Sequence, residues 1–398
     1  MFQTGRETGT FPVASGMEKD SRIAPRSMPV YLHHIETAVP RTAYPQTFIA
    51  ERMKRWAGQG DRKQERIISY LYSQSGIDTR HSAVPDFVPG ADAGIFYDGN
   101  TDTLRNPTTG ERNALYTQEA KRLGAEVACK SFGAGASGYD ASEVTHIVTV
   151  SCTGFFQPGL DYHLVRTLNL PPSVPRFHLG FMGCYAAFPA LRLAKTICES
   201  DPAAVVLVVS LELCSLHLRF DGDTDALIGG SVFADGAAAA IVSARQPAEG
   251  KSALLLERFD TTLTPTGEGD MAWTIGDNGF AMRLSSYVPE ILHANIADAM
   301  KPTLGGAGLR VADVDHWAVH PGGRAIIDKV RSALDLCEGS LAASRRVLKE
   351  YGNMSSATIL FVLREMLRSG TLTEPGAPVV AMAFGPGLTV ESAVLRKA

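Results

Sequence analysis

The sequence predicts an α/β protein in which two related halves share one layered core. Apolar runs of strand length, at 145–150 and 203–211, alternate with stretches of helical periodicity, which is typical of sheets covered by helices on both faces. The segment 314–323 and the helical stretch after it repeat the organisation of 144–150 and its helix, which indicates two related halves. Of the 398 residues, 45% are hydrophobic, enough for a large core.

The local pattern predicts each element in turn. Alternation and apolar runs predict strands at 30–36, 145–150, 203–211 and 317–320. Helical spacing predicts helices at 46–56, 114–132, 160–168, 188–195, 325–334 and 358–367. Between these elements, residues 85–110 are rich in Gly, Pro, Asp and Asn, which predicts a long loop.

Composition excludes several classes of function. The 38 basic and 42 acidic residues give a net charge of -4, and no basic run suggests nucleic acid as a partner. Six cysteines without a CxxC pair indicate neither a zinc site nor any other metal, and suit a reducing cytoplasm. The longest apolar run, 203–209, is too short to span a membrane. Residues 1–28 lack the apolar region of a signal peptide and are expected to form a flexible leader.

Cys184 is the candidate nucleophile. It follows a glycine and precedes small apolar residues and the predicted helix 188–195. The free N–H groups and positive dipole end of a helix N-terminus favour thiolate over thiol, and glycine upstream permits a sharp turn. A lone cysteine is also often a small buried core residue. Its assignment therefore depends on a base elsewhere in the chain.

His320 and Asn353 are the candidates for the base and its partner. His320 ends the predicted strand 317–320 and enters a Pro-Gly-Gly turn before a helix, and sites in α/β sheets form at the carboxyl ends of strands. Asn353 precedes the predicted helix 358–367. There it is either a helix-capping residue or an amide directed at a substrate oxygen.

Together these segments resemble the Cys-His-Asn centre of type III polyketide synthases, the chalcone synthase family of the thiolase superfamily. Cys184 lies in Gly-x-x-Gly-Cys-Tyr-Ala-Ala, His320 in His-Pro-Gly-Gly, and Asn353 in Gly-Asn-Met-Ser-Ser-Ala-Thr. Three further family motifs occur in the same order, at 152–162, 233–238 and 383–391. The resemblance covers the chain from about residue 30 to its end.

The resemblance implies a thiolase-like layered αβαβα fold of two pseudo-equivalent halves. We expect an N-terminal half over residues 29–250 that carries the cysteine, and a C-terminal half over 251–398 that carries the histidine and the asparagine. It also implies the chemistry. Cys184 takes the acyl group of an acyl-CoA while His320 holds its thiolate as an ion pair. His320 and Asn353 stabilise the enolate that forms when malonyl-CoA loses carbon dioxide. The scheme needs no cofactor, and CoA thioesters are the substrates.

Further residues match positions that line the family's cavity. Phe233 matches a gatekeeping phenylalanine, with a core aromatic after a strand-like segment 230–232 as its alternative. Met282 stands where plant chalcone synthases carry a second gatekeeping phenylalanine, and its flexible side chain leaves room for an alkyl chain. The remaining predicted lining residues are Trp273, Cys152, Cys214, Ser355, Phe384, Gly385, Pro386 and Gly387.

Met282 and the other differences from the plant enzymes in the predicted cavity lining favour a similarity to the bacterial alkylresorcinol and alkylpyrone synthases. We therefore expect a long-chain fatty acyl-CoA starter and an alkylpyrone or alkylresorcinol product of secondary metabolism. Malonyl-CoA alone, or a short or aromatic starter, remains an alternative, as in enzymes of the tetrahydroxynaphthalene, phloroglucinol or chalcone type. Two further hypotheses are a single-round ketoacyl synthase, which the His-Pro-Gly-Gly motif disfavours, and a catalytically silent acyl-binding scaffold, which the intact Cys-His-Asn set disfavours.

The family also implies a CoA site and a homodimer. Arg62, Lys63, Arg66 and Arg80 are the basic residues nearest the family's CoA-binding helix, and they bind CoA phosphates or form a solvated face. Family members are homodimers in which a residue near Gln157 reaches the cavity of the partner. We expect the same assembly here.

Overall fold

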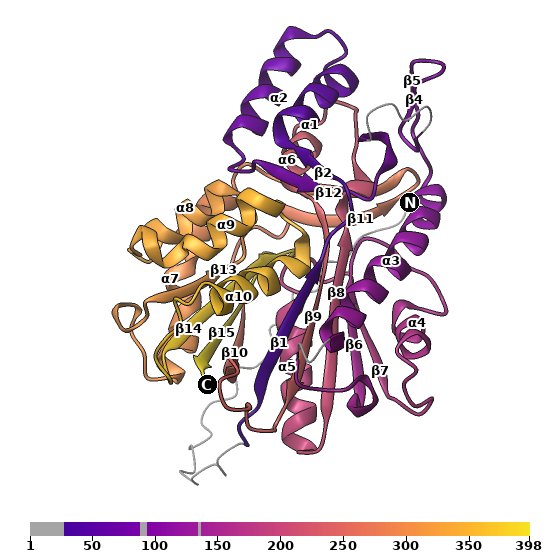
Figure 1. Ribbon diagram of the computed structural model, residues 1–398. Coiled ribbons are helices and arrows are strands. Elements are labelled where there is room, and N and C mark those ends of the chain that lie inside the picture. Colours follow the sequence, from indigo (N-terminus) through magenta and orange to yellow (C-terminus); the bar gives the residue numbers. More distant parts are fainter. Residues whose placement is uncertain (1–27, 88–93, 134–136) are drawn as a thin grey trace, which may run out of the picture.

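The central feature of the structure, a computed structural model, is a mixed sheet of nine strands in two groups (Figure 1). The structure describes residues 28–87, 94–133 and 137–398, so the predicted leader lies almost wholly outside the described residues. The first group consists, in spatial order, of β7 (Arg176–Gly180), β6 (His146–Ser151), β8 (Val205–Leu213), β9 (Asp235–Ser243) and β1 (Tyr31–Ala38). The second consists of β10 (Leu254–Leu263), β15 (Thr389–Lys397), β14 (Pro378–Gly385) and β13 (His316–Val319).

The two groups have the same order. The first group begins β1, β9, β8, β6, and the second runs β10, β15, β14, β13. In both groups the strand that comes first in the sequence therefore lies beside the strand that comes last. Only two residue pairs, Tyr31 with Leu255 and Leu32 with Leu254, join β1 to β10. The sheet is therefore two half-sheets with a short seam, as the predicted pseudo-equivalent halves require.

Side chains alternate between two cores along the strands, because successive residues point to opposite faces. In β8, Val206 and Val208 face a central core, while Val205 and Leu207 face an outer one. The central core contains α5 (Ala187–Ser200) and α10 (Thr358–Arg368). The outer cores contain α3 (Thr109–Phe132) and α4 (Leu160–Thr167) on one side and α7 (Val288–Gly306) and α8 (Arg324–Ala333) on the other (Figure 1). This is the predicted αβαβα order.

Two local predictions differ from the structure. The segment before Phe233 is not strand-like, because residues 230–232 end helix α6 (Thr224–Val232). The predicted loop 85–110 contains two short paired strands, β4 (Tyr97–Asp98) and β5 (Thr103–Leu104). Asp86 organises its beginning by accepting hydrogen bonds from the backbone N–H groups of Phe96 and Tyr97, both at 2.7 Å.

A third group of elements covers one end of the sheet. It includes α1 (Gln46–Met53), α2 (Arg62–Gln74), α6, β2 (Ala43–Pro45), β3 (Thr79–His81) and a hairpin of β11 (Met271–Gly276) and β12 (Gly279–Leu284) (Figure 1). A further helix, α9 (Ala342–Tyr351), lies between β3 and α10. No helix in the described part of the chain is both long and apolar enough to cross a membrane.

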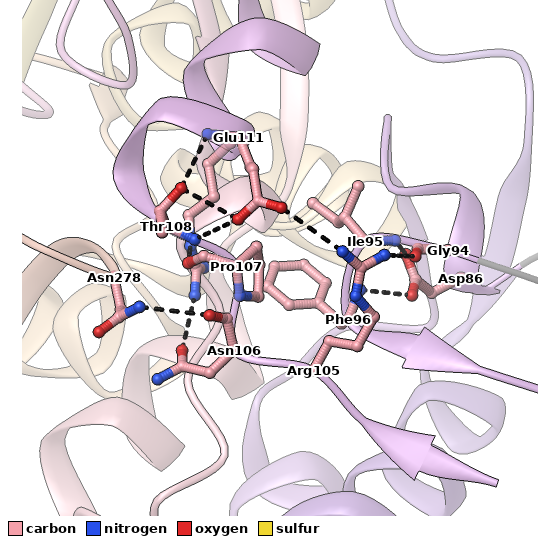
Figure 2. Close-up of polar contacts among 11 residues, drawn as sticks. Asp86, Gly94, Ile95, Phe96, Arg105, Asn106, Pro107, Thr108, Glu111 and Asn278 are labelled. Atoms are coloured by element: carbon pink, nitrogen blue, oxygen red, sulfur yellow. Dashed lines mark hydrogen bonds and ion pairs between the residues drawn. The ribbon is translucent and has the colours of Figure 1, made fainter. Parts of the chain in front are cut away.

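The hairpin tip is held by the start of α3. The Thr109 N–H donates to Asp277 O at 2.8 Å, and the Gly279 N–H donates to Thr109 Oγ1 at 2.8 Å. Asn278 Nδ2 donates to Asn106 O at 3.2 Å, beside the Thr108–Glu111 capping box that begins α3 (Figure 2). This anchor fixes the hairpin that carries Trp273 and Met282, which are directly paired across its two strands.

Candidate active site

Cys184 lies in the turn between β7 and α5. The chain turns at Gly183, whose φ of +80° is a left-handed conformation that glycine adopts readily. A Cβ on Gly183 would come within 2.5 Å of Pro386 Cδ, so only glycine permits this close packing. Helix α5 begins at Ala187, three residues after Cys184. The predicted mounting of the cysteine before a helix N-terminus is therefore present.

His320 directly follows β13, the edge strand of the second half-sheet. Its backbone N–H donates to Met382 O of β14 at 2.8 Å, which continues the pairing of the two strands. The side chain is 1% exposed, and neither Nδ1 nor Nε2 has a hydrogen-bond partner among the described residues. The imidazole thus retains one donor and one acceptor for a ligand.

Asn353 does not cap α10, whose capping residue is Ala357. Its Oδ1 accepts from the Ser355 N–H at 2.9 Å, which holds the turn before the helix. Its side chain also reaches Gly322 O, 3.4 Å from Nδ2, and the Cys184 thiol. The Asn353 backbone pairs with the segment around Phe233: its N–H donates to Val232 O at 2.9 Å, and its O accepts from Ala234 N at 2.8 Å. This bridge joins the segment before β9 to the segment before α10 at the site.

A cavity of about 370 Å³ brings the three candidates together, with Cys184, His320 and Asn353 all on its wall. Of the other predicted lining residues, it contains Cys152, Cys214, Phe233, Trp273, Met282, Ser355, Phe384 and Pro386. Gly385 and Gly387 do not line it. A Cβ on Gly385 would lie 2.4 Å from Tyr185 Cδ1, so this residue instead permits the 383–387 loop to pack against the cysteine turn.

Burial disfavours a charge on either catalytic candidate alone. It raises the pKa of the Cys184 thiol to about 11, opposed by hydrogen bonds from Ser355 and Asn353. It lowers the pKa of His320 to about 3. The direction for Cys184 is opposite to the lowering expected from the sequence. The expected ion pair would offset both penalties, because each charge stabilises the other.

Two buried residues of the site have no counterpart among the predicted ones. Glu212, at the end of β8, accepts hydrogen bonds from the Cys152 N–H at 3.0 Å and Thr153 Oγ1 at 2.9 Å, and also from Ser356 Oγ. Its position directly after the apolar run 203–211 was the available signal. Because its oxygens bond the segments that carry Cys152 and Ser355, Glu212 supports one wall of the cavity.

His217 supports the part of the wall around Trp273. Its ring stacks on Phe280 with centroids 4.2 Å apart and meets Trp273 edge-on at 5.3 Å. Nε2 lies 2.8 Å from Thr153 O, and Nδ1 accepts from the Phe280 N–H at 3.0 Å. Trp273 Nε1 donates to Cys152 O at 2.8 Å, which further fixes this wall. These contacts require a neutral His217, because a protonated Nδ1 has no acceptor capacity.

We predict a pH-dependent loss of stability from His217. Burial lowers its pKa to about 4 in the folded protein, below the ordinary 6.5. The unfolded chain therefore takes up a proton first, and stability falls as the pH drops from 6.5 towards 4. Between pH 7 and 5, wild type should lose about 2 kcal/mol more unfolding free energy than His217→Gln, measured by urea denaturation. Parallel pH curves for the two proteins would contradict this account.

The structure separates the four basic residues predicted near CoA. Arg62, Lys63 and Arg66 are exposed on α2, the helix whose Leu71 and Gln74 line the mouth of the cavity. Arg80 is only 4% exposed, and its Nη1 donates to Gly230 O and Phe233 O at 2.8 and 2.7 Å. The alternative that Arg80 lies on a solvated face was therefore wrong, because its guanidinium is buried and bonds the backbone behind Phe233.

Comparisons with known proteins agree with this geometry. Residues 21–246 match the N-terminal domain of chalcone and stilbene synthases, and residues 256–398 match their C-terminal domain. The alpha-pyrone synthesis polyketide synthase-like Pks18 of Mycobacterium tuberculosis is 32% identical over 375 residues, which cover 92% of this chain and 91% of that protein. A protein of the same name from Mycobacterium bovis shows the same identity and coverage.

Two solved structures have the same fold. PKS-I from the brown alga Ectocarpus siliculosus has a TM-score of 0.84 at 30% identity and covers 94% of this chain and 100% of that one. The C-terminal type III polyketide synthase domain of Steely1, a type I/III hybrid from Dictyostelium, has a TM-score of 0.81 at 25% identity. It covers 92% of this chain and 99% of that domain.

Proposed function

The chain belongs to the chalcone and stilbene synthase family and is a type III polyketide synthase, which is an acyltransferase. We propose that this enzyme extends long-chain fatty acyl starters that are attached to Cys184. The product of the proposed reaction is an alkylpyrone or an alkylresorcinol. The observation that carries this proposal is the largely apolar cavity of about 370 Å³ that contains Cys184, His320 and Asn353.

In the loading step, His320 accepts the proton of the Cys184 thiol as the sulfur attacks the carbonyl carbon of the acyl-CoA. The tetrahedral intermediate expels the CoA thiolate, which recovers that proton from His320. The unpartnered nitrogens of His320 support this role, since both are free to exchange a proton with groups in the cavity. Because burial penalises each separate charge, proton transfer and attack are coupled.

In the extension step, malonyl-CoA loses carbon dioxide, and the electron pair of the broken C–C bond forms an enolate. His320 and Asn353 Nδ2 donate hydrogen bonds to the enolate oxygen. The enolate carbon then attacks the acyl-Cys184 carbonyl, and the Cys184 thiolate leaves. The chain, now two carbons longer and on CoA, returns to Cys184 for the next round. This scheme uses the side chains of the cavity and draws on no metal or redox cofactor.

The starter class rests on the shape and chemistry of the wall. Beyond Met282 and Phe233 lies a second, smaller chamber of about 50 Å³, also largely apolar, which is enough for a few water-sized groups. Met282 is unbranched and flexible, so it adjusts to a passing alkyl chain. These features favour a fatty acyl tail over a rigid aromatic starter. The α-pyrone synthesis in the name of the Mycobacterium relatives supports the pyrone form of the product.

The mouth of the cavity offers a site for the CoA phosphates. Arg324, the first residue of α8, lines the mouth and hydrogen bonds to Gln74 of α2. Lys63 lies eight residues before Leu71 on α2, which places it about 12 Å further along the helix. We assign the CoA phosphates to Arg324 together with the exposed Arg62, Lys63 and Arg66.

Product analysis tests the starter class. The protein is incubated with malonyl-CoA and acyl-CoA starters from acetyl to stearoyl, and the products are identified by mass spectrometry. Long-chain pyrones or resorcinols are expected. Use of only short or aromatic starters, or a naphthalene or phloroglucinol from malonyl-CoA alone, would overturn the proposed starter while leaving the polyketide synthase assignment in place.

We also propose a homodimer in the cytoplasm. Strand β7 is an open edge of the sheet, and large apolar side chains on and near it are exposed: Phe155 at 41%, Tyr162 at 44% and Phe177 at 40%. Gln157 is exposed in the loop before α4, near the same edge. The six cysteines are free, which suits a reducing compartment. Sedimentation should give a dimer at micromolar concentration; a monomer there would rule this assembly out.

A further inference from the structure

The main cavity and the second chamber share part of their walls. Cys214, Phe233, Trp273 and Met282 line both spaces. Beyond them, the second chamber is lined by Ile49 of α1 and by Leu218 and Ala226. A chain attached to Cys184 that is too long for the main cavity therefore has to pass Met282 and Phe233 to reach this space.

Gly229 of α6 lines the second chamber next to this shared wall. A Cβ built on Gly229 would be 3.6 Å from Met282 Sδ and 3.7 Å from Phe233 Cδ2. Both are ordinary contact distances, so a methyl group would fit without a clash and would occupy the space between the two side chains. The backbone of Gly229 is helical and has no positive φ. Neither backbone strain nor a steric clash therefore requires glycine at this position.

Glycine nevertheless carries a cost here. In a helix interior it is less favourable than alanine by about 1 kcal/mol. Gly229 thus lowers helix stability, has room for a methyl group and lies beside Met282 and Phe233, which line both chambers. An open passage for substrate is the function that accounts for these observations together.

We propose that Gly229 sets the longest starter chain that the enzyme accepts, by keeping the gap between Met282 and Phe233 open to the second chamber. This inference rests on the proposed function and refines it. The ligand that threads the gap is an unbranched alkyl tail, because only a narrow and flexible chain passes between a methionine and a phenylalanine without displacing the backbone. Side chains larger than hydrogen at position 229 confine the tail to the main cavity.

Substitution of Gly229 tests the proposal. Wild type, Gly229→Ala and Gly229→Leu are assayed with starters from hexanoyl-CoA to stearoyl-CoA, and kcat/KM for each starter is divided by the value for hexanoyl-CoA in the same protein. For the longest starter that wild type accepts, this ratio should fall about tenfold or more in Gly229→Leu and by a smaller factor in Gly229→Ala. Unchanged ratios in both variants would overturn the proposal.

Two further variants separate gap filling from effects on the helix. Gly305→Ala makes the same glycine-to-alanine change in helix α7, at a residue that lines neither chamber and where the new methyl group would have no neighbour within 4 Å. It should keep the wild-type ratios, and a loss equal to that of Gly229→Ala would contradict the proposal. The double variant Gly229→Ala/Met282→Ala removes the side chain that the new methyl group touches, so it should regain long starters. No recovery there would also count against the gap.

The same assays test the role of Gly229 separately from the proposed starter class on which this inference rests. The wild-type profile alone tests whether the starters are long fatty acyl chains. The change of the length limit on substitution tests Gly229, whatever that limit is in wild type. Suppose that wild type accepts only short starters, while the longest accepted starter is still shorter in Gly229→Leu. That result would overturn the proposed starter class and would still support the role of Gly229.

Discussion

Cys184→Ala should abolish chain extension, with a loss of product formation of about 10⁴-fold or more. The reason is that, in the proposed mechanism, the growing chain is attached to this thiol, which the cavity wall presents together with His320 and Asn353. Intact-protein mass spectrometry after incubation with a starter acyl-CoA gives the direct measurement. Wild type should gain the mass of one acyl group, and the variant should gain none.

Cys198→Ala is the matched control for this experiment. Cys198 lies on α5, the helix that follows Cys184, and its thiol is fully buried against Ala204 O and Val242 O. The control removes a thiol from the same helix outside the cavity, and it should still become acylated. An acyl adduct on Cys184→Ala, or product formation by it, would remove Cys184 from the role of nucleophile.

Asn353→Asp should lower the rate of carbon dioxide release from malonyl-CoA by about 10²- to 10³-fold, the usual effect of losing one donor to a developing oxyanion. The aspartate keeps an oxygen for the Ser355 N–H, so the turn before α10 is preserved. It replaces the Nδ2 donor with a negative charge, which repels the enolate. Release of ¹⁴C-labelled carbon dioxide at saturating malonyl-CoA measures the effect on kcat.

Asn295→Asp is the control for that substitution. Asn295 lies on α7 and donates to Ile291 O at 2.7 Å, so the same change of side chain occurs at a residue that does not line the cavity. The variant should release carbon dioxide within about twofold of the wild-type rate, as surface substitutions rarely disturb a distant site. Equal losses in both variants would mean that Asn353 acts through stability and not through the enolate.

Much of the architecture is readable from local patterns. Apolar runs and helical spacing predicted β6, β8, α3, α8 and α10 to within a few residues, because each pattern reports which faces of one element are buried. The ends were less certain. The predicted strand-like segment before Phe233 is helical, since small residues such as Gly230 and Ser231 have no strong preference and tertiary packing decides their conformation.

The basic residues show where local patterns stop. Arg80 and Arg66 looked alike along the chain, yet Arg66 is exposed on α2 while Arg80 bonds carbonyl oxygens 150 and 153 residues away. Glu212 and His217 escaped prediction for the same reason. Their partners come from segments about 60 residues away, and a buried polar group is recognisable only once those partners are in place.

The sequence by itself determined the family and the reaction class, because Cys184, His320 and Asn353 occur in motifs whose local form the chemistry constrains. Only the tertiary structure decided how these residues are placed: that one cavity collects them, that burial raises the pKa of Cys184 and lowers that of His320, and that Gly229 lies beside the two side chains shared by two chambers. The physical reason is that volume, burial and charge arise from contacts between distant segments. A glycine without a side chain reveals its role only when its neighbours are known.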